Sequence, residues 1–143
     1  MRTLKQLLAG KQRQPVVVAP IDTVYHALIL MAQHDIGALL VLDGEKLVGI
    51  FSERDYARKI MLHGKSSKET LVKEIMSDRV AYVTPATTLD DCMALMTERR
   101  FRHLPVLSEA CEVLGVISIG DLVKETISNQ QMIISELERY ISG

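Results

Sequence analysis

The sequence predicts an α+β fold made of two similar βαββα repeats that pack together about a pseudo-twofold axis. The motif Gly-Ile-Phe-Ser-Glu-Arg-Asp at residues 49–55 recurs as Gly-Val-Ile-Ser-Ile-Gly-Asp at residues 115–121. The strand-like and helix-like stretches before each motif also follow the same order. A unit of about sixty residues covers its sheet poorly by itself, so we expect the two units to share one globule.

The first repeat, predicted at residues 16–64, opens with a short strand and a helix. Residues 16–18 are three valines, and Pro20 prevents a helix from running through them. Asp22 or Thr23 can cap the helix that follows. Its apolar residues recur at the spacing of one helical face and are Val24, Ala27, Leu28 and Met31. This face is expected to pack on a sheet.

A hairpin and a second helix complete the repeat. Apolar runs at residues 38–42 and 47–51 flank the turn-forming residues 43–46, which is typical of two antiparallel strands. Helix-forming residues then continue from Glu53 to about Leu62, and Gly64 is a suitable stop.

The second repeat, predicted at residues 80–126, contains a counterpart of each element. A strand is expected at residues 80–84, and Pro20 corresponds to Pro85 at an offset of 65 residues. After the hairpin turn the offset becomes 66, from Gly49 to Gly115, so this turn carries one extra residue. Turns are where insertions are tolerated.

Three segments lie outside the repeats. We predict an N-terminal helical segment within residues 1–15, ending at Gly10, a linker at 65–79 and a C-terminal helix at 127–143. The last segment places Ile127, Ile134, Leu137 and Ile141 on one stripe. Packing against its own globule and packing against a second chain both remain open.

Composition excludes several classes of protein. The net charge is −1, from 17 basic and 18 acidic side chains, which argues against a nucleic-acid-binding surface. The longest unbroken apolar run, residues 27–32, is too short to cross a bilayer, and residues 1–8 lack the features of a signal peptide. A cytoplasmic location is therefore expected, without a membrane partner.

Neither a metal site nor a catalytic centre is predicted. Cys92 and Cys111 form no CxxC pair and have no histidine at ligand spacing, so both are interpreted as free thiols. Ser52 and Ser118 have no histidine at an informative spacing, and no phosphate-binding glycine loop of the Walker type occurs. The protein is not expected to be an enzyme.

The duplicated serine and aspartate have two interpretations. Ser-x-x-Asp at a helix start has the spacing of a capping box, which needs no ligand. The same helix N-terminus can bind an anion, because its free amides and partial positive charge attract a phosphate. Both roles can coexist in one residue.

The motifs at 49–55 and 115–121 occur together with Val83-Thr84-Pro85 before a helix and with Arg102-His103-Leu104-Pro105-Val106. In this order they resemble a tandem pair of CBS domains, the module named after cystathionine β-synthase, which forms a Bateman unit. The chain is similar to small stand-alone bacterial regulatory proteins of this kind. The resemblance implies the CBS-pair fold and an adenine nucleotide, AMP, ATP or NAD(H), bound in clefts between the repeats to report energy or redox state.

The resemblance also implies roles for individual residues. The motif aspartates, Asp55 and Asp121, would hold the ribose hydroxyls, since an ionised carboxylate can accept two hydrogen bonds from a diol. The residues expected near phosphate are Ser52, Arg54, Arg58, Arg102, His103 and Ser118. Those expected near adenine are Val18, Ile36, Met76, Val83 and Thr84.

The cations are distributed unequally between the repeats. Arg54 corresponds to Gly120, whereas Arg102 and His103 correspond to Gly37 and Ala38. If the pseudo-twofold axis brings the clefts together, Arg54 and Arg102 would face phosphates from opposite repeats. The two sites then need not share one ligand.

Two functions from different classes follow. In the first, a nucleotide shifts the relative orientation of the repeats and so alters contacts with an unidentified effector protein or with a dimer mate. The expected dimer is a homodimer through the faces of the CBS pair. In the second, the chain is a constitutive dimerisation and protein-interaction domain whose motifs only cap helices.

Overall fold

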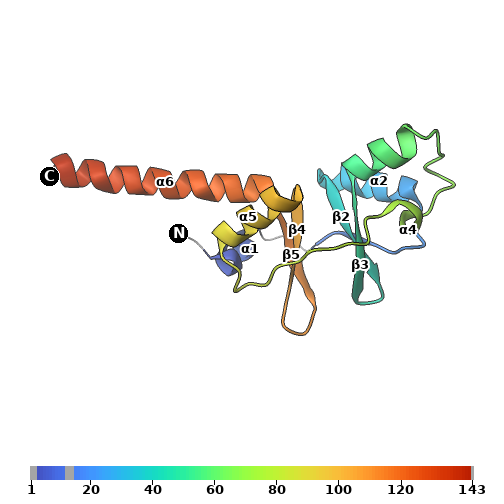
Figure 1. Cartoon of the computed structure of the whole chain (residues 1–143), viewed down its shortest axis with the longest axis horizontal. Helices are drawn as coiled ribbons and strands as arrows, with labels where there is room; N and C mark the ends of the chain where they lie inside the picture. The colour runs from blue at the N-terminus through green and yellow to red at the C-terminus, as the bar shows by residue number, and fades with distance from the viewer. Residues whose placement is uncertain (1–2, 12–14, 143) are drawn as a thin grey trace.

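The computed structural model describes residues 3–11 and 15–142 and contains two α+β halves beside each other, from which one long helix extends (Figure 1). The helices are α1 (Leu4–Lys11), α2 (Val24–His34), α3 (Glu53–Tyr56), the π-helix η1 (Ala57–Met61), α4 (Val72–Ile75), α5 (Leu89–Arg99) and α6 (Ile119–Ser142). The strands are β1 (Val17–Val18), β2 (Ala38–Asp43), β3 (Lys46–Ser52), β4 (His103–Leu107) and β5 (Val113–Ser118). The predicted fold class is confirmed.

The hairpins of the two repeats have matching irregularities. Strands β2 and β3 pair antiparallel with a register shift after Val41, and β4 and β5 pair antiparallel with a register shift after Val106. Val41 lies opposite Gly49, and Val106 lies opposite Gly115. The internal repeat therefore extends to the bulge in each hairpin.

The helix ends are equivalent as well. Thr23 accepts a hydrogen bond from the backbone N–H of His26, and Thr88 accepts one from that of Asp91, so both threonines are N-caps as expected. The two helices end at Asp35 and Arg100, which adopt the left-handed conformation with φ of 51° and 58°. Each residue turns the chain from its helix toward the following hairpin.

The first strand of the second repeat differs from the prediction. Val17 and Val18 pair parallel with β2, but residues 80–84 contribute only a bridge from Val83 to Val106. To extend this bridge into a strand, the backbone of residue 105 would have to donate a further hydrogen bond, and Pro105 has no amide hydrogen. Leu40, the counterpart of Pro105, retains its amide and pairs with Val17, so the first repeat has a three-stranded sheet and the second a two-stranded sheet.

The helices after the motifs also differ from the prediction. The expected helix from Glu53 to Leu62 is α-helical only to Tyr56 and continues as η1. The motif helix and the C-terminal tail of the second repeat are one continuous helix, α6, so the boundary expected after residue 126 is not a break in secondary structure.

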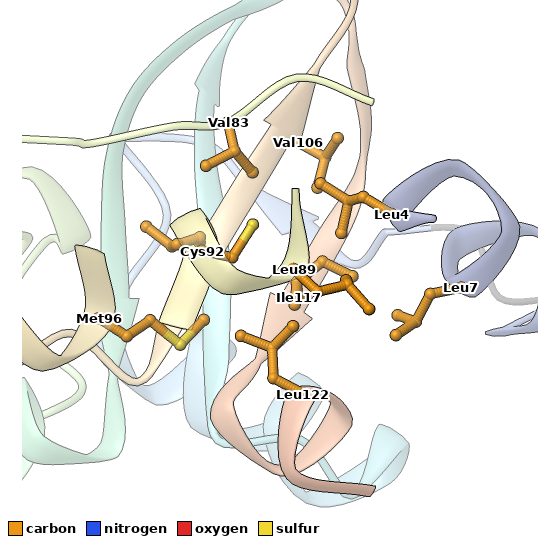
Figure 2. Packing of buried hydrophobic residues seen from close by; sticks show 10 residues of the cluster. Leu4, Leu7, Val83, Leu89, Cys92, Met96, Val106, Ile117 and Leu122 are labelled. Carbon is orange, nitrogen blue, oxygen red and sulfur yellow. The ribbon is translucent and has the colours of Figure 1, made fainter. Parts of the chain in front are cut away.

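The segment before each repeat packs in the core of the other repeat. Leu4 and Leu7 of α1 are buried in the core of the second repeat, with Leu89, Cys92 and Ile117 (Figure 2). Val72 and Ile75 of α4 are buried in the core of the first repeat. The N-terminal segment and the linker therefore each cover the sheet of the other repeat, and Gly10 does not end α1, which reaches Lys11.

Each motif glycine provides space for the helix that precedes the other repeat. A Cβ at Gly49 would lie 2.6 Å from Sδ of Met76, and a Cβ at Gly115 would lie 2.7 Å from Cδ2 of Leu8. Both glycines allow a close approach that no larger residue permits without a shift.

None of the described helices is long and apolar enough to cross a membrane.

Candidate functional site

Both Ser-x-x-Asp motifs form capping boxes at the start of the helix after the hairpin. In the first, the Ser52 amide donates to Asp55 Oδ2 at 3.0 Å, and the Asp55 amide donates to Ser52 Oγ at 3.2 Å. In the second, the corresponding distances between Ser118 and Asp121 are 2.8 and 3.1 Å. The capping role is therefore real in both repeats, and it leaves part of the acceptor capacity of each carboxylate for other groups.

A second pair of equivalent bonds fixes the start of these helices. The amide of Glu53 donates to the carbonyl of Gly37 at 3.0 Å, and the amide of Ile119 donates to the carbonyl of Arg102 at 2.8 Å. The segment before each hairpin is thus tied to the helix that follows it. Arg102 in this way has its backbone at the N-terminus of α6.

The linker before the second repeat covers Asp55. Oδ1 of Asp55 accepts from Ser77 Oγ at 3.3 Å and lies 3.5 Å from Nζ of Lys59. Lys59 also donates to the carbonyl of Ile75 at 2.9 Å. Asp55 is only 9% exposed as a result, so any ligand at this carboxylate must approach through the linker contacts.

A cleft of about 770 Å³ lies between the two repeats. Its residues from the first half are Pro15, Val16, Gln33, His34, Asp35, Ile36, Gly37 and Ala38, and those from the second half, with Leu8 of α1, are His103, Leu114, Gly115, Val116 and Ser118. The motif of the second repeat thus faces the strand and helix ends of the first. This volume is within the range typical of small-molecule sites.

The sequence-predicted site residues are only partly brought together. Ile36, His103 and Ser118 line the cleft. Asp121 is not a lining residue, but its carboxylate accepts from the amide of Ser118, which is one. Arg54, Arg58 and Arg102 are exposed and do not belong to the cleft lining.

The residues predicted near adenine lie in different parts of the structure. Val18 and Val83 are buried in the two cores and do not line the cleft. Met76 packs against Gly49, and the amide of Thr84 donates to Oγ1 of Thr87. Of this group, only Ile36 lies in the cleft.

Sequence reasoning did not select Pro15, Val16 or the stretch 33–35 as lining residues. The sequence did contain one indication of the cleft: Gly37 and Ala38 correspond to Arg102 and His103. If the motif of one repeat faces the start of the hairpin in the other, Gly37 and Ala38 lie at the cleft as their counterparts do. Gly37 lies close to His103 here: a Cβ at Gly37 would be 3.9 Å from His103 Cε1.

Metal binding and thiol chemistry are two further possibilities for the residues that the structure describes. Residues 3–11 and 15–142 contain no group of three or more His, Cys, Asp or Glu side chains that could hold a metal ion. Burial raises the pKa of the Cys92 thiol, and the nearby negative charge of Asp91 raises it further. Cys92 is therefore held in its unreactive protonated form.

Comparisons with known proteins agree on one family. The family model described as "CBS domain" matches residues 10–62 and 72–128. A solved protein with CBS domains from Burkholderia ambifaria is 52% identical, with a TM-score of 0.85 over 90% of this chain and 96% of that one. The mitochondrial CBS domain-containing protein CBSX3 of Arabidopsis thaliana is 42% identical over 127 residues, which are 85% of this chain and 61% of that protein.

A more distant structure shares the fold alone. It is a CBS domain protein from Pyrobaculum aerophilum, solved as a complex with AMP, and it is 21% identical. The TM-score is 0.75, and the alignment covers 84% of this chain and 89% of that one.

Proposed function

The chain belongs to the CBS-domain family as a tandem pair, and on that premise we propose that it is a regulatory module that binds an adenine nucleotide between its repeats. The observation that carries the proposal is the 770 Å³ cleft lined by residues of both repeats. The AMP complex of the P. aerophilum protein supports AMP as the first ligand to test.

The chemistry of the cleft suits such a ligand. Val16, Ile36 and Val116 offer apolar surface to a base, while Ser118 adds a hydroxyl donor at the N-terminus of α6. The carboxylate of Asp121 accepts from the amide of Ser118, a residue of the cleft lining, and in this proposal it binds the ribose diol.

The two motif aspartates are not equivalent in this proposal. Asp121 is bonded to Ser118, which lines the cleft, whereas Asp55 is held by Ser77 of the linker and by Lys59 of η1. We therefore assign the stronger binding site to Ser118 and Asp121. Occupation of a second site at Ser52 and Asp55 would require the linker to move.

Regulation would follow from the position of the cleft. A nucleotide that contacts residues 34–38 of one repeat and residues 115–118 of the other would favour one relative orientation of the two. NAD(H) or ATP in place of AMP would make the same module report redox or energy state, and an effector protein or a second chain would read the orientation.

A thermal-shift panel with AMP, ADP, ATP, NAD and NADH tests the proposal. A ligand at a hundred times its dissociation constant should stabilise the fold by about 2.7 kcal/mol. Asp121→Asn should abolish most of this shift, because asparagine retains an acceptor oxygen for the cap but loses the charge that favours the diol.

The matched control is Asp43→Asn, at the exposed end of β2, which should keep the full shift. If none of the nucleotides stabilises the wild-type protein, nucleotide sensing is excluded and the constitutive interaction domain is the better description. If a shift persists undiminished in Asp121→Asn, the site lies elsewhere.

A further inference from the structure

Helix α6 carries an apolar stripe that its own globule leaves uncovered. Its main contacts within the chain are with α5 and β5, and the helix leaves the globule along most of its length (Figure 1). Its buried residues, Leu122 and Glu125, are 1% and 8% exposed. Five apolar residues on another side are each at least 43% exposed, and they are Val123, Ile127, Ile134, Leu137 and Ile141.

The stripe follows a heptad register. Ile127, Ile134 and Ile141 occupy successive a positions, and Val123, Gln130 and Leu137 occupy successive d positions. Leu122 and Glu125 occupy positions c and f, so the stripe points away from the surface that covers the repeat. Packing against its own globule, which the sequence left open, therefore does not account for the stripe.

We propose that this stripe is the seam of a parallel, in-register two-stranded coiled coil with α6 of a second copy of the chain. Isoleucine at a and leucine at d favour two parallel strands. The 24 residues of α6 span roughly 36 Å with a diameter of about 10 Å. The exposed stripe from Val123 to Ile141 occupies roughly 27 Å of this length and is available to a second chain.

Gln130 determines the direction and register. In a parallel pair it lies opposite the same residue of the second copy, where each amide can donate to and accept from the other. Antiparallel pairing centred on the exposed stripe would set this amide against an isoleucine and leave it without a partner. A single polar residue in a seam is a known determinant of register.

The charges of α6 are compatible with this arrangement. The charged side chains from Lys124 onward occupy positions c, e and f, with none at a, d or g. Ile133 and Tyr140 occupy g and are 49% and 86% exposed, so they flank the seam and cover its edge in the pair. Parallel pairing sets the e positions against these g residues, so no like charges meet.

Sedimentation of the full chain without nucleotide tests the interface, and its outcome does not depend on ligand binding. The wild-type protein should be a dimer, and Ile134→Glu should weaken dimerisation roughly 100-fold or more, because it places two unpaired charges in the seam. Met132→Glu is the matched control, because Met132 is 62% exposed and lies at position f, away from the seam. Ile134→Glu lies beyond the globule, and an unchanged thermal transition would verify its fold.

A cross-link tests the direction. In a Cys111→Ser background, Leu137→Cys should form an intermolecular disulfide on mild oxidation, because it lies at a d position and leaves Gln130 in place, and Met132→Cys should not. A monomeric wild-type protein, or a dimer that survives Ile134→Glu through another face such as Ile21, Tyr25 and Ile29, would overturn the proposal. A dimer that is sensitive to Ile134→Glu but not cross-linked by Leu137→Cys would overturn the parallel register.

Discussion

Ser77 Oγ donates to Asp55 Oδ1 at 3.3 Å and so joins the linker to the motif of the first repeat. The same linker pairs with β3 through reciprocal bonds of 2.9 Å between Ser77 and Ile50. Asp55 thus caps α3 with one oxygen and holds the linker with the other. Its counterpart Asp121 caps α6 through Ser118, which lines the cleft, so the two repeats differ chemically although they share the motif serine and aspartate.

We expect Asp55→Ala to destabilise the fold by about 2–4 kcal/mol, because it removes an N-terminal cap and the acceptor for Ser77. Urea denaturation measures the change in the free energy of unfolding. Asp43→Ala, at the exposed end of β2, should change it by no more than about 0.5 kcal/mol. Equal effects of the two substitutions would mean that the Asp55 contacts add nothing to stability.

The motif glycines should respond differently to a methyl group. Gly49→Ala is expected to destabilise by about 1–3 kcal/mol, because its Cβ would meet Sδ of Met76 at 2.6 Å and the backbone oxygen of Ser77 at 3.0 Å. Gly115→Ala meets only the end of the Leu8 side chain, at 2.7 Å, and should be milder.

A double-mutant cycle isolates the second contact. Combined with Leu8→Ala, the substitution Gly115→Ala should cost less than it does alone, since the clash is removed. Gly120→Ala is the control, because its nearest neighbour, Ser118 Oγ, would be 3.6 Å from the new Cβ. Strict additivity of the Gly115 and Leu8 substitutions would show that α1 does not press on β5 in solution.

The sequence predicted the repeats because each element repeats with its own local signal. Thr23 and Thr88 cap helices, and turn residues at 43–46 connect a hairpin. The crossed position of α1 and α4 was missed, since helices of eight and four residues give little periodicity and only tertiary packing stabilises them. The sequences of α1 and α4 nevertheless show the same apolar spacing, because Leu4, Leu7 and Leu8 correspond to Val72, Ile75 and Met76.

The site was predictable only in part for the same reason. Ser118 and His103 belong to a motif that can be read along the chain. Pro15 and Val16 reach the cleft only because α1 crosses to the second repeat, a long-range arrangement that no local pattern specifies. The covering of Asp55 by Ser77, 22 residues away, is likewise a tertiary contact.

The two thiols should differ in reactivity. Cys111 is exposed, whereas Cys92 is buried and its thiol pKa is raised by burial and by Asp91. A colorimetric thiol reagent at about pH 8 should label one cysteine quickly and the other only on unfolding. Fast labelling of two thiols in the native protein would contradict the burial of Cys92.

The same thiol predicts a pH effect. With its pKa raised, the folded state holds the proton more tightly than the unfolded chain, so the stabilisation is complete below the ordinary pKa of 9.0 and is lost as pH rises above it. The stability difference between the wild-type protein and Cys92→Ala should therefore shrink in alkaline solution. A difference that stays constant with pH would exclude this linkage.

The asymmetric arginines provide a test of phosphate recognition. Arg102 has its carbonyl bonded to the first amide of α6, and Arg54 lies on α3 after the equivalent motif. If their guanidinium groups contact phosphate, Arg102→Ala and Arg54→Ala should each weaken AMP binding by about 10- to 100-fold, as expected for a hydrogen bond to a charged group. Adenosine, which has no phosphate, should bind each variant as it binds the wild-type protein.

Calorimetry with both ligands separates this role from a general loss of structure. Arg139→Ala, near the far end of α6, is the charge-matched control and should leave both affinities unchanged. A loss for AMP alone in Arg102→Ala, with Arg54→Ala unaffected, would confine phosphate recognition to the cleft of the second repeat. Equal losses for AMP and adenosine would remove both arginines from phosphate binding.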